Sequence, residues 1–422
     1  MRIGILGGGV AGLSAAYFLR NTDHEVELFE ASDFTGGLAR SFEWHDFWCD
    51  LAPHRLHTDD PALLEEMKEL TPMNQVRRYS KIFIRKKWIG DPVNAVEIMV
   101  KFFPIQAMRI ALTYLRTKFQ RNLPENNFEE LVISQFGTGL NDFFFKPYSE
   151  KLFGIPANQI SAAWGRRKIR VAGVKDMIQR QSRLYFKTFH YPKQRGYGAI
   201  CEAVHEKVKD TLNLETKLVA IEHPKNDSDT YKCTFEGPDG KTFVKEFDTL
   251  ITTLPVSSFA DMMGLDLDLG FRPARLVYLL IDKPQLSENH WFYFADNKRI
   301  VNRVAEFKNF QCEGGQPDKT VICCEVTMIE DYSLEAVYEC LEEANLADRS
   351  QVLDTKIIDI EHAYPVYDTT YEVQMEKVKT FFDKHPRVHH VGRHAEFAHR
   401  DIDEIFEEAK RIGEKIEGAT KS

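Results

Sequence analysis

The chain alternates between two patterns of apolar and polar positions. Short apolar runs, such as 3–6 and 249–254, are typical of buried parallel strands. From residue 93 to 190 the apolar positions instead recur with helical spacing, and proline and glycine mark the loops. Strand patterns return in three further segments: 275–282, 290–307 and 320–327. These patterns predict an α/β fold in which a helical segment and an antiparallel sheet are inserted into a parallel-sheet domain.

The changes of pattern also predict where the domains begin and end. A length of 422 residues, 43% of them hydrophobic, is enough for full cores in two or three domains. The two insertions divide the parallel-sheet domain into three pieces. We expect 1–91, 191–274 and 367–422 to form the parallel-sheet domain, 92–190 the helical domain, and 275–366 the antiparallel sheet domain.

Charge and cysteine content narrow the class of protein. The formal net charge of −9 gives no general basic surface, so nucleic acid is not an expected partner. The seven cysteines show no C-x-x-C spacing, and we expect free thiols in a reducing cytoplasm. No stretch is apolar enough to predict a transmembrane helix. His54 and His57 have no acidic or cysteine partner at ligand spacing, so no metal site is expected.

The first twelve residues carry the strongest chemical signal. Gly7, Gly9 and Gly12 follow an apolar strand in the pattern Gly-x-Gly-x-x-Gly and open a helix-spaced segment. Gly7 permits a tight turn, Gly9 lets a pyrophosphate approach the backbone, and Gly12 lets the helix pack closely on the sheet. The helix N-terminus, with Val10 and Ala11, presents N–H groups to phosphate oxygens. The motif predicts a bound dinucleotide.

A glutamate and a second glycine pair follow the first glycine motif at the distance expected for a dinucleotide-binding domain. The strand 25–29 ends in Glu30, where a carboxylate accepts hydrogen bonds from the adenosine ribose hydroxyls. Next comes Gly36-Gly37-Leu38-Ala39-Arg40. A glutamate followed by Gly-Gly-x-x-Arg resembles the FAD-binding signature of the amine oxidase and glutathione reductase-like flavoproteins. The resemblance implies a Rossmann-like domain of the glutathione reductase type, with FAD as cofactor.

The helical insertion is amphipathic and basic in part. The side chains that make part of it basic are Lys101, Arg109, Arg116, Lys118 and Arg121. One interpretation is a helix that lies on a membrane surface. The other, which we favour, is a solvated helix face whose apolar positions fill the insertion's own core.

The order of landmarks along most of the chain resembles the UDP-galactopyranose mutase family, whose members have FAD-binding, helical and antiparallel sheet domains. The stretch 52–58 is similar to that family's histidine loop, which implies that His54 lies beside the isoalloxazine. The stretch 146–154 is similar to its Tyr-Thr-Glu-Lys-x-Trp-Gly segment, whose tyrosine stacks on uracil and corresponds to Tyr148. Phe153 stands here in place of the family's tryptophan.

Three further stretches are similar to the family's phosphate-binding elements. They imply diphosphate contacts by Arg167, Arg303 and Tyr364. Two arginines on different elements could clamp a diphosphate, because guanidinium forks match phosphate oxygens and stay charged. From the residues alone, Arg303 could instead pair with Glu306, Arg167 could lie in solvent, and the tyrosines could be ordinary core aromatics.

The C-terminal stretch 392–397 is similar to the family's flavin loop, and His399 replaces a second phosphate tyrosine. Tyr185 corresponds loosely to a substrate tyrosine. The expected catalytic residues are His54, Arg167 and Arg303. The expected substrate contacts are Tyr148, Phe153, Arg167, Tyr185, Arg303, Tyr364 and His399. The expected FAD contacts are Gly7, Gly9, Val10, Ala11, Gly12, Glu30, Ala31, Gly36, Gly37, Leu38, Ala39, Arg40, His54, Val219, Gly392, Arg393, Asp401 and Ile402.

The resemblance implies a flavin-dependent nucleotide-sugar mutase with a UDP-linked substrate. Such an enzyme interconverts pyranose and furanose forms through an adduct between the sugar and N5 of reduced FAD, so the protein needs no nucleophile of its own. Similar landmarks occur in amine oxidase and protoporphyrinogen oxidase-like proteins. The alternative is therefore an FAD-dependent oxidoreductase in cell-surface polysaccharide or lipid biosynthesis. A homodimer is one assembly that the sequence allows.

Overall fold

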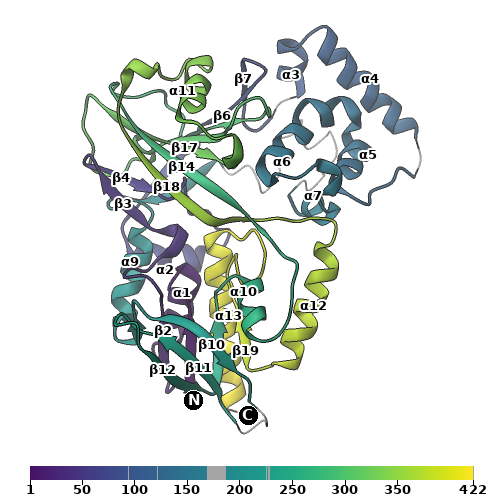
Figure 1. Ribbon diagram of the computed structural model, residues 1–422. Helices are drawn as coiled ribbons and strands as arrows, with labels where there is room; N and C mark the ends of the chain where they lie inside the picture. Colours follow the sequence, from purple (N-terminus) through teal and green to yellow (C-terminus); the bar gives the residue numbers. More distant parts are fainter. Residues whose placement is uncertain (94, 121, 169–186, 225, 227–228, 422) are drawn as a thin grey trace.

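The computed structural model describes residues 1–421 except 94, 121, 169–186, 225 and 227–228, and its elements gather into three regions (Figure 1). A parallel-sheet region contains both termini. A second sheet and a helical region lie side by side beyond it. This is the predicted α/β arrangement with a helical and an antiparallel sheet insertion.

Five parallel strands form the central sheet of the first region, in the order β19-β13-β1-β2-β9. Ile5 and Leu28 belong to the core on one face of the sheet, whereas Leu6 and Phe29 belong to the core on the other. All four are almost fully buried, as is usual for a parallel sheet covered on both faces. The strands are β1 (Arg2–Leu6), β2 (Glu25–Phe29), β9 (Leu212–Asn213), β13 (Thr249–Thr252) and β19 (Val388–His390).

Helices cover one face of this sheet, and a small antiparallel sheet covers the other. On the helical face α1 (Val10–Leu19) packs against α9 (Ala199–Val208) and α13 (Ile402–Lys421). On the opposite face Phe235 stacks on Phe29, with 4.1 Å between the ring centroids. The covering sheet consists of β10 (Lys217–Glu222), β11 (Tyr231–Glu236) and β12 (Thr242–Phe247).

The second region is built on a seven-stranded sheet in the order β18-β14-β17-β16-β15-β6-β7. Its strands are β6 (Ser80–Ile84), β7 (Lys87–Gly90), β14 (Phe271–Ile281), β15 (Trp291–Phe294), β16 (Val301–Glu306), β17 (Thr320–Val326) and β18 (Val352–Pro365). The first two come from the piece 1–91 that we assigned to the parallel-sheet domain. They join this sheet because β6 pairs in parallel with β15, a contact between distant segments. We expected the first piece of the parallel-sheet domain to end at residue 91, but the chain already enters the seven-stranded sheet at β6.

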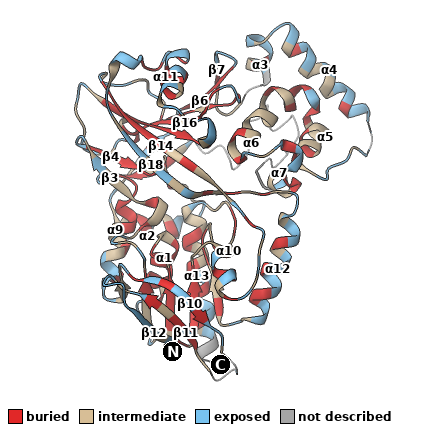
Figure 2. Cartoon of the chain, viewed as in Figure 1, coloured by how far each residue is buried: buried red, intermediate tan, exposed pale blue. Residues whose placement is uncertain are grey.

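The helical region contains α3 (Ala95–Lys101), α4 (Ile105–Phe119), α5 (Phe128–Leu140), α6 (Lys146–Phe153) and α7 (Ala162–Lys168). Its core is formed by Phe128, Val132 and Phe143. We expected the apolar positions of α4 to contribute to such a core. Instead most of the large ones are exposed, and much of the ribbon of α4 is pale blue in Figure 2.

Shorter elements connect the regions. β5 (Met73–Arg77) pairs with β8 (Thr188–Pro192), so the end of the predicted helical segment is a strand. The remaining elements are α2 (Pro61–Leu70), β3 (Ser41–Trp44), β4 (Phe47–Asp50), α10 (Val256–Met262), α11 (Leu334–Glu343) and α12 (Tyr371–Lys384).

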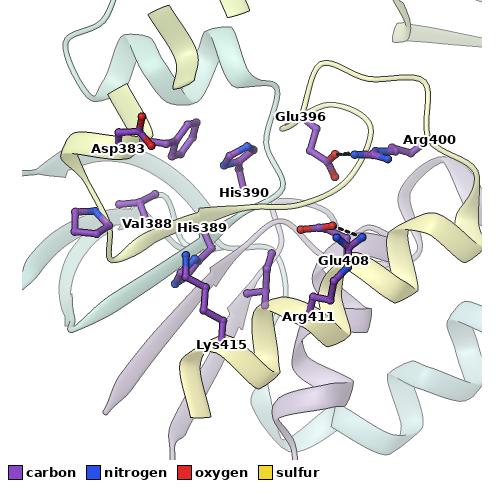
Figure 3. Close-up of a pocket in the computed structure, with 12 residues that line it drawn as sticks. Asp383, Val388, His389, His390, Glu396, Arg400, Glu408, Arg411 and Lys415 are labelled. Atoms are coloured by element: carbon purple, nitrogen blue, oxygen red, sulfur yellow. Dashed lines mark hydrogen bonds and ion pairs between the residues drawn. The ribbon is translucent and has the colours of Figure 1, made fainter. Parts of the chain in front are cut away.

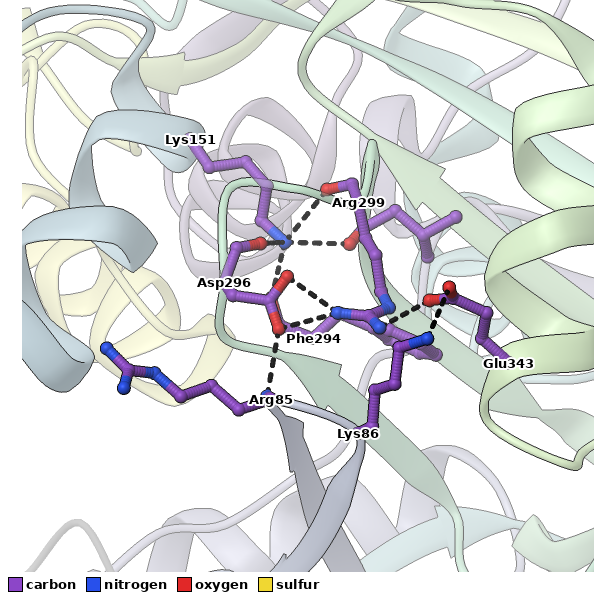
Figure 4. A network of polar contacts seen from close by, with 8 residues as sticks. Arg85, Lys86, Lys151, Phe294, Asp296, Arg299 and Glu343 are labelled. Carbon is purple, nitrogen blue, oxygen red and sulfur yellow. Dashed lines mark hydrogen bonds and ion pairs between the residues drawn. The ribbon is translucent and has the colours of Figure 1, made fainter. Parts of the chain in front are cut away.

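A buried lysine joins the helical region to the seven-stranded sheet (Figure 4). Lys151, on α6, is 2% exposed, and its ammonium group donates to the carbonyl oxygens of Asp296 at 2.9 Å and Arg299 at 3.3 Å. It also donates to the carbonyls of Val301, at 2.9 Å, and Phe294. These carbonyls belong to the loop between β15 and β16 and to its ends. Lys151 therefore fixes α6 against the start of β16.

We expect Lys151→Met to lower the free energy of unfolding by about 3 kcal/mol or more, because it leaves several buried carbonyls without a donor. Urea denaturation would measure the loss. The matched control is Lys298→Met in the same loop, where the lysine is exposed and the change should stay within about 0.5 kcal/mol. A Lys151→Met protein as stable as this control would contradict the assigned role.

Candidate functional site

One cavity of about 620 Å³ joins the parallel-sheet region to the seven-stranded sheet. It extends from the glycine-rich turn after β1 to the side chains of Arg303 and Tyr364 on β16 and β18. Sixteen of the predicted site residues line it: Gly7, Gly9, Val10, Ala11, Glu30, Gly37, Leu38, Ala39, His54, Arg303, Tyr364, Gly392, Arg393, His399, Asp401 and Ile402.

The glycine-rich turn leaves room for a ligand at the start of α1. A Cβ atom built on Gly9 would meet only Gly37 Cα, at 4.0 Å, so this side of the turn is open. The first N–H groups of a helix have no partner within the helix, and here they belong to Val10 and Ala11 at the cavity wall. Gly12 lies behind the turn, where a Cβ atom would lie 1.9 Å from the carbonyl oxygen of Gly7. This cradle fits a pyrophosphate.

The carboxylate of Glu30 is held at the end of β2 beside this turn. It accepts hydrogen bonds from the backbone N–H of Gly8 at 2.7 Å and of Ser32 at 2.9 Å. Each carboxylate oxygen has a second lone pair, so Glu30 can also accept from ribose hydroxyls. The second glycine pair lies alongside, because Gly36 N–H donates to the Gly8 carbonyl at 2.9 Å. The residues present therefore fit the adenosine and pyrophosphate parts of FAD.

Several predicted FAD contacts do not line the cavity. Gly36 supports the turn from behind, and Ala31 is exposed beyond Glu30. The guanidinium of Arg40 lies 3.8 Å from the centre of the Phe34 ring. Val219 is 36% exposed on β10, in the sheet that covers the far face.

His54 lines the middle of the cavity in a fixed orientation. Its Nδ1 lies 3.1 Å from the carbonyl oxygen of Ala52, which can only accept, so Nδ1 carries the hydrogen. Its ring stacks on Tyr197, with 5.4 Å between the ring centroids. Burial, with the charges of Arg393 and Arg303, lowers the pKa of His54 to about 3. The imidazole is therefore neutral at physiological pH, and Nε2 is a hydrogen-bond acceptor.

This low pKa predicts a specific loss of stability in acid. Unfolding would restore the pKa of His54 to its ordinary value near 6.5. The unfolded chain therefore takes up a proton on His54 as the pH falls below 6.5, whereas the folded chain takes it up only near pH 3. Between pH 7 and pH 5 the wild type should lose about 2 kcal/mol more of its free energy of unfolding than His54→Gln. Urea denaturation at the two pH values would measure this, and equal losses would contradict it.

The far end of the cavity holds a buried ion pair. On adjacent strands, Arg303 donates to Oε2 of Glu325 from Nη2 at 2.6 Å and from Nε at 3.0 Å. The hydroxyl of Tyr364 donates to the other carboxylate oxygen. Burial alone would lower the pKa of Arg303, but the neighbouring Glu325 carboxylate raises it. Burial raises the pKa of Tyr364.

Glu325 was not among the predicted site residues. The signal in the sequence was a lone carboxylate in the apolar run 320–326. The pairing of Arg303 with Glu306 that we considered does not occur. Glu306 instead accepts from the backbone N–H of Leu286 at 2.7 Å and from the Thr320 hydroxyl at 2.9 Å.

Tyr148 and His399 flank this ion pair. The Tyr148 ring makes an edge contact with Tyr293, at 6.4 Å between centroids. Its hydroxyl is close enough to Arg303 and Tyr364 for both to influence its pKa electrostatically. Burial raises the pKa of Tyr148. The His399 ring lies almost parallel to that of Tyr364, at 6.2 Å.

Among the described residues, two predicted substrate contacts, Tyr148 and Phe153, do not line the cavity. Phe153 is 3% exposed and packs its ring on Trp164 at 5.1 Å, inside the helical core, because it lies five residues from Tyr148 and points from a different side of α6. Arg167 lies on α7, but its side chain is outside the described part of the chain, as is the whole of Tyr185.

A second cavity, of about 490 Å³, lies between α12, β19 and α13 (Figure 3). None of the predicted site residues line it. Four of its charged side chains form two ion pairs, Arg400 with Glu396 and Arg411 with Glu408, each at 2.6 Å. We therefore assign the chemistry to the larger cavity.

Two negative findings apply to the residues that the structure describes. Among them, no three histidine, cysteine, aspartate or glutamate side chains gather as ligands for a metal ion. No helix in the same part of the chain is long and apolar enough to cross a bilayer.

Solved structures with the same fold include flavoenzymes of different activities. Reduced UDP-galactopyranose mutase matches 100% of this chain and 94% of its own, with a TM-score of 0.81 and 22% sequence identity. A protein from Exiguobacterium sp. 255-15, named provisionally as a protoporphyrinogen oxidase, matches 99% and 98%, with a TM-score of 0.75 and 17% identity. Putrescine oxidase bound to putrescine matches 99% of both chains, with a TM-score of 0.66 and 15% identity.

Comparison by sequence identifies the family. L-amino-acid oxidase of Crotalus adamanteus is 41% identical over 68 residues, which are 16% of this chain and only 13% of the oxidase. The family model for flavin-containing amine oxidoreductases matches residues 10–336, more than half of the chain. The chain therefore belongs to the family of flavin-containing amine oxidoreductases and is an enzyme with FAD as its cofactor.

Proposed function

We propose that this protein is a flavin-dependent nucleotide-sugar mutase, which interconverts pyranose and furanose forms of a UDP-linked sugar. One observation carries the proposal. The cavity that begins at the FAD cradle continues without a break to Arg303 and Tyr364, two residues suited to bind a diphosphate. A substrate bound there would have its reacting carbon between the phosphate contacts and the flavin.

The residues of the cradle would hold the cofactor. The N–H groups at the start of α1 would bind the pyrophosphate, and Glu30 would accept from the ribose. Bound reduced FAD supplies a nucleophile for the anomeric carbon of the sugar. His54, held neutral by its burial, could accept a hydrogen bond at Nε2 without adding a positive charge near that centre.

The residues at the far end would bind and orient the substrate. Glu325 engages Nε and Nη2 of Arg303, and the remaining N–H donors of the guanidinium can reach a phosphate. Tyr148 lies beside this ion pair, and its ring would stack on the base of the substrate. By fixing the nucleotide, these side chains would orient the sugar for the reaction.

A second function is favoured by a different observation. Glu325 compensates the charge of Arg303, so this end of the cavity is less cationic than two phosphates would require if Arg303 acted alone. A neutral or cationic substrate would suit a net-neutral pair. The alternative is therefore an FAD-dependent oxidoreductase, as the family name implies.

The redox requirement separates the two functions. The purified protein would be incubated with a panel of UDP-sugars, beginning with UDP-galactose, in the oxidised and in the dithionite-reduced state. Anion-exchange chromatography would separate the products. An isobaric product formed only by the reduced protein supports the mutase. Bleaching of the oxidised flavin by a substrate, with no isobaric product, would replace it with the oxidoreductase.

A further inference from the structure

Large apolar side chains lie exposed on α3, on α4 and at Phe103 between them. We name this set of residues the α3–α4 stripe. Each member is between 53% and 86% exposed, and Ile105 and Phe119 are the most exposed at 83% and 86%. Its residues are Val100, Phe103, Ile105, Met108, Leu112, Leu115 and Phe119. The two helices lie at the outer edge of the molecule (Figures 1 and 2).

The stripe is not part of the core of the helical region. Its positions on α4 are spaced alternately by three and four residues, which places them on one face of the helix. The opposite face is the one that packs on α5. There Thr113 Oγ1 accepts from the N–H of Gly139 at 2.9 Å, and Thr117 is buried. Because the inner face already anchors α4, the stripe is available to an external partner.

The segment that carries the stripe is positively charged, although the chain as a whole carries −9. Residues 95–119 contain four basic side chains and one acidic side chain, a net charge of +3. The acid, Glu97, pairs with Lys101 at 2.7 Å, and Arg109 pairs with Asp142 at 2.5 Å. Arg116 and Lys118 are exposed in the last turns of α4, which itself contains no acid.

We propose that the α3–α4 stripe docks the protein onto a lipid bilayer that contains anionic lipids. An exposed apolar face with cationic flanks has the chemistry to insert among acyl chains while its charges meet the headgroups. The helices would lie in the interface and not cross it. A second copy of the chain fits less well, because a two-fold contact would place this cationic face against itself.

Vesicle sedimentation of the flavin-loaded protein tests the proposal. The protein should sediment with vesicles of 30% phosphatidylglycerol and 70% phosphatidylcholine, and bind pure phosphatidylcholine at least about 10-fold more weakly. Salt at 0.5 M should weaken the first binding. Failure to bind the anionic vesicles, or equal binding to both kinds, would overturn the proposal.

Variants on the stripe identify the surface. Ile105→Gln/Leu112→Gln/Phe119→Gln should reduce the partition coefficient by at least about 30-fold. The matched control is Val244→Gln/Leu353→Gln/Val373→Gln, three exposed apolar residues elsewhere, which should bind as the wild type does. Flavin content would verify that both variants fold. Unchanged binding by the stripe variant overturns the proposal.

Sedimentation velocity tests whether a second copy of the chain covers the stripe instead. We expect the stripe variant to have the same oligomeric state as the wild type. A wild-type dimer that the same substitutions convert to a monomer, without any vesicle binding by the wild type, would assign the stripe to a second copy and overturn the membrane proposal.

Discussion

Gly12→Ala is expected to yield a protein that purifies without its flavin. The added Cβ atom would lie 1.9 Å from the carbonyl oxygen of Gly7 and 3.4 Å from the Ile5 side chain. A backbone oxygen cannot move aside as the end of a side chain can, so α1 must shift away from β1. That shift misplaces the N–H groups that bind the pyrophosphate. We also expect the free energy of unfolding to fall by about 3 kcal/mol, in the range found for overpacked cores.

The ratio of flavin absorbance to protein absorbance after purification measures the first effect, and urea denaturation the second. The matched control is Gly270→Ala. Gly270 is exposed, and a Cβ atom there would have no neighbour within 4 Å. This control should retain its flavin and remain within about 0.5 kcal/mol of the wild type. If Gly12→Ala bound flavin as fully as Gly270→Ala, the close packing of α1 on β1 would not matter for the cofactor.

The glycine motif was predictable from the sequence because its physics is local. The strand, the turn, the helix and the acid at the end of the next strand lie within thirty residues, and each residue type has a separate reason to be there. The FAD cofactor and the α/β fold that followed from this motif are confirmed by the family and by the solved structures. The individual site residues stay predictions.

Features that depend on distant segments were not predictable. The pairing of β6 with β15 joins residues about 210 positions apart, and no local pattern encodes it. The partner of Arg303 is Glu325 on the neighbouring strand. From the sequence we had considered Glu306, which is nearer along the chain. For α4, periodicity identified an apolar face without indicating whether the protein or a partner covers it.

Arg303→Met is expected to weaken UDP binding by about 10- to 150-fold, the equivalent of one charge-assisted hydrogen-bonding group at 1.5–3 kcal/mol. The substitution also leaves Glu325, which is 2% exposed, with the hydroxyl of Tyr364 on β18 as its remaining side-chain hydrogen-bond donor among the described residues. An unpaired carboxylate there repels a diphosphate, so the true loss should lie near the upper end. Titration calorimetry with UDP on the flavin-loaded protein would measure it.

Glu325→Gln separates the charge of Arg303 from the packing of the pair. Glutamine keeps the size of the side chain and an oxygen for Arg303, but it removes the negative charge that competes with phosphate for the guanidinium. UDP affinity should then be maintained or rise, while Arg303→Met lowers it. Arg349→Met, which breaks an exposed ion pair with Glu335, is the control and should leave UDP affinity unchanged. Equal losses in the Arg303 and Glu325 variants would mean that the pair only supports the sheet, and the diphosphate assignment would fail even if the flavin remained bound.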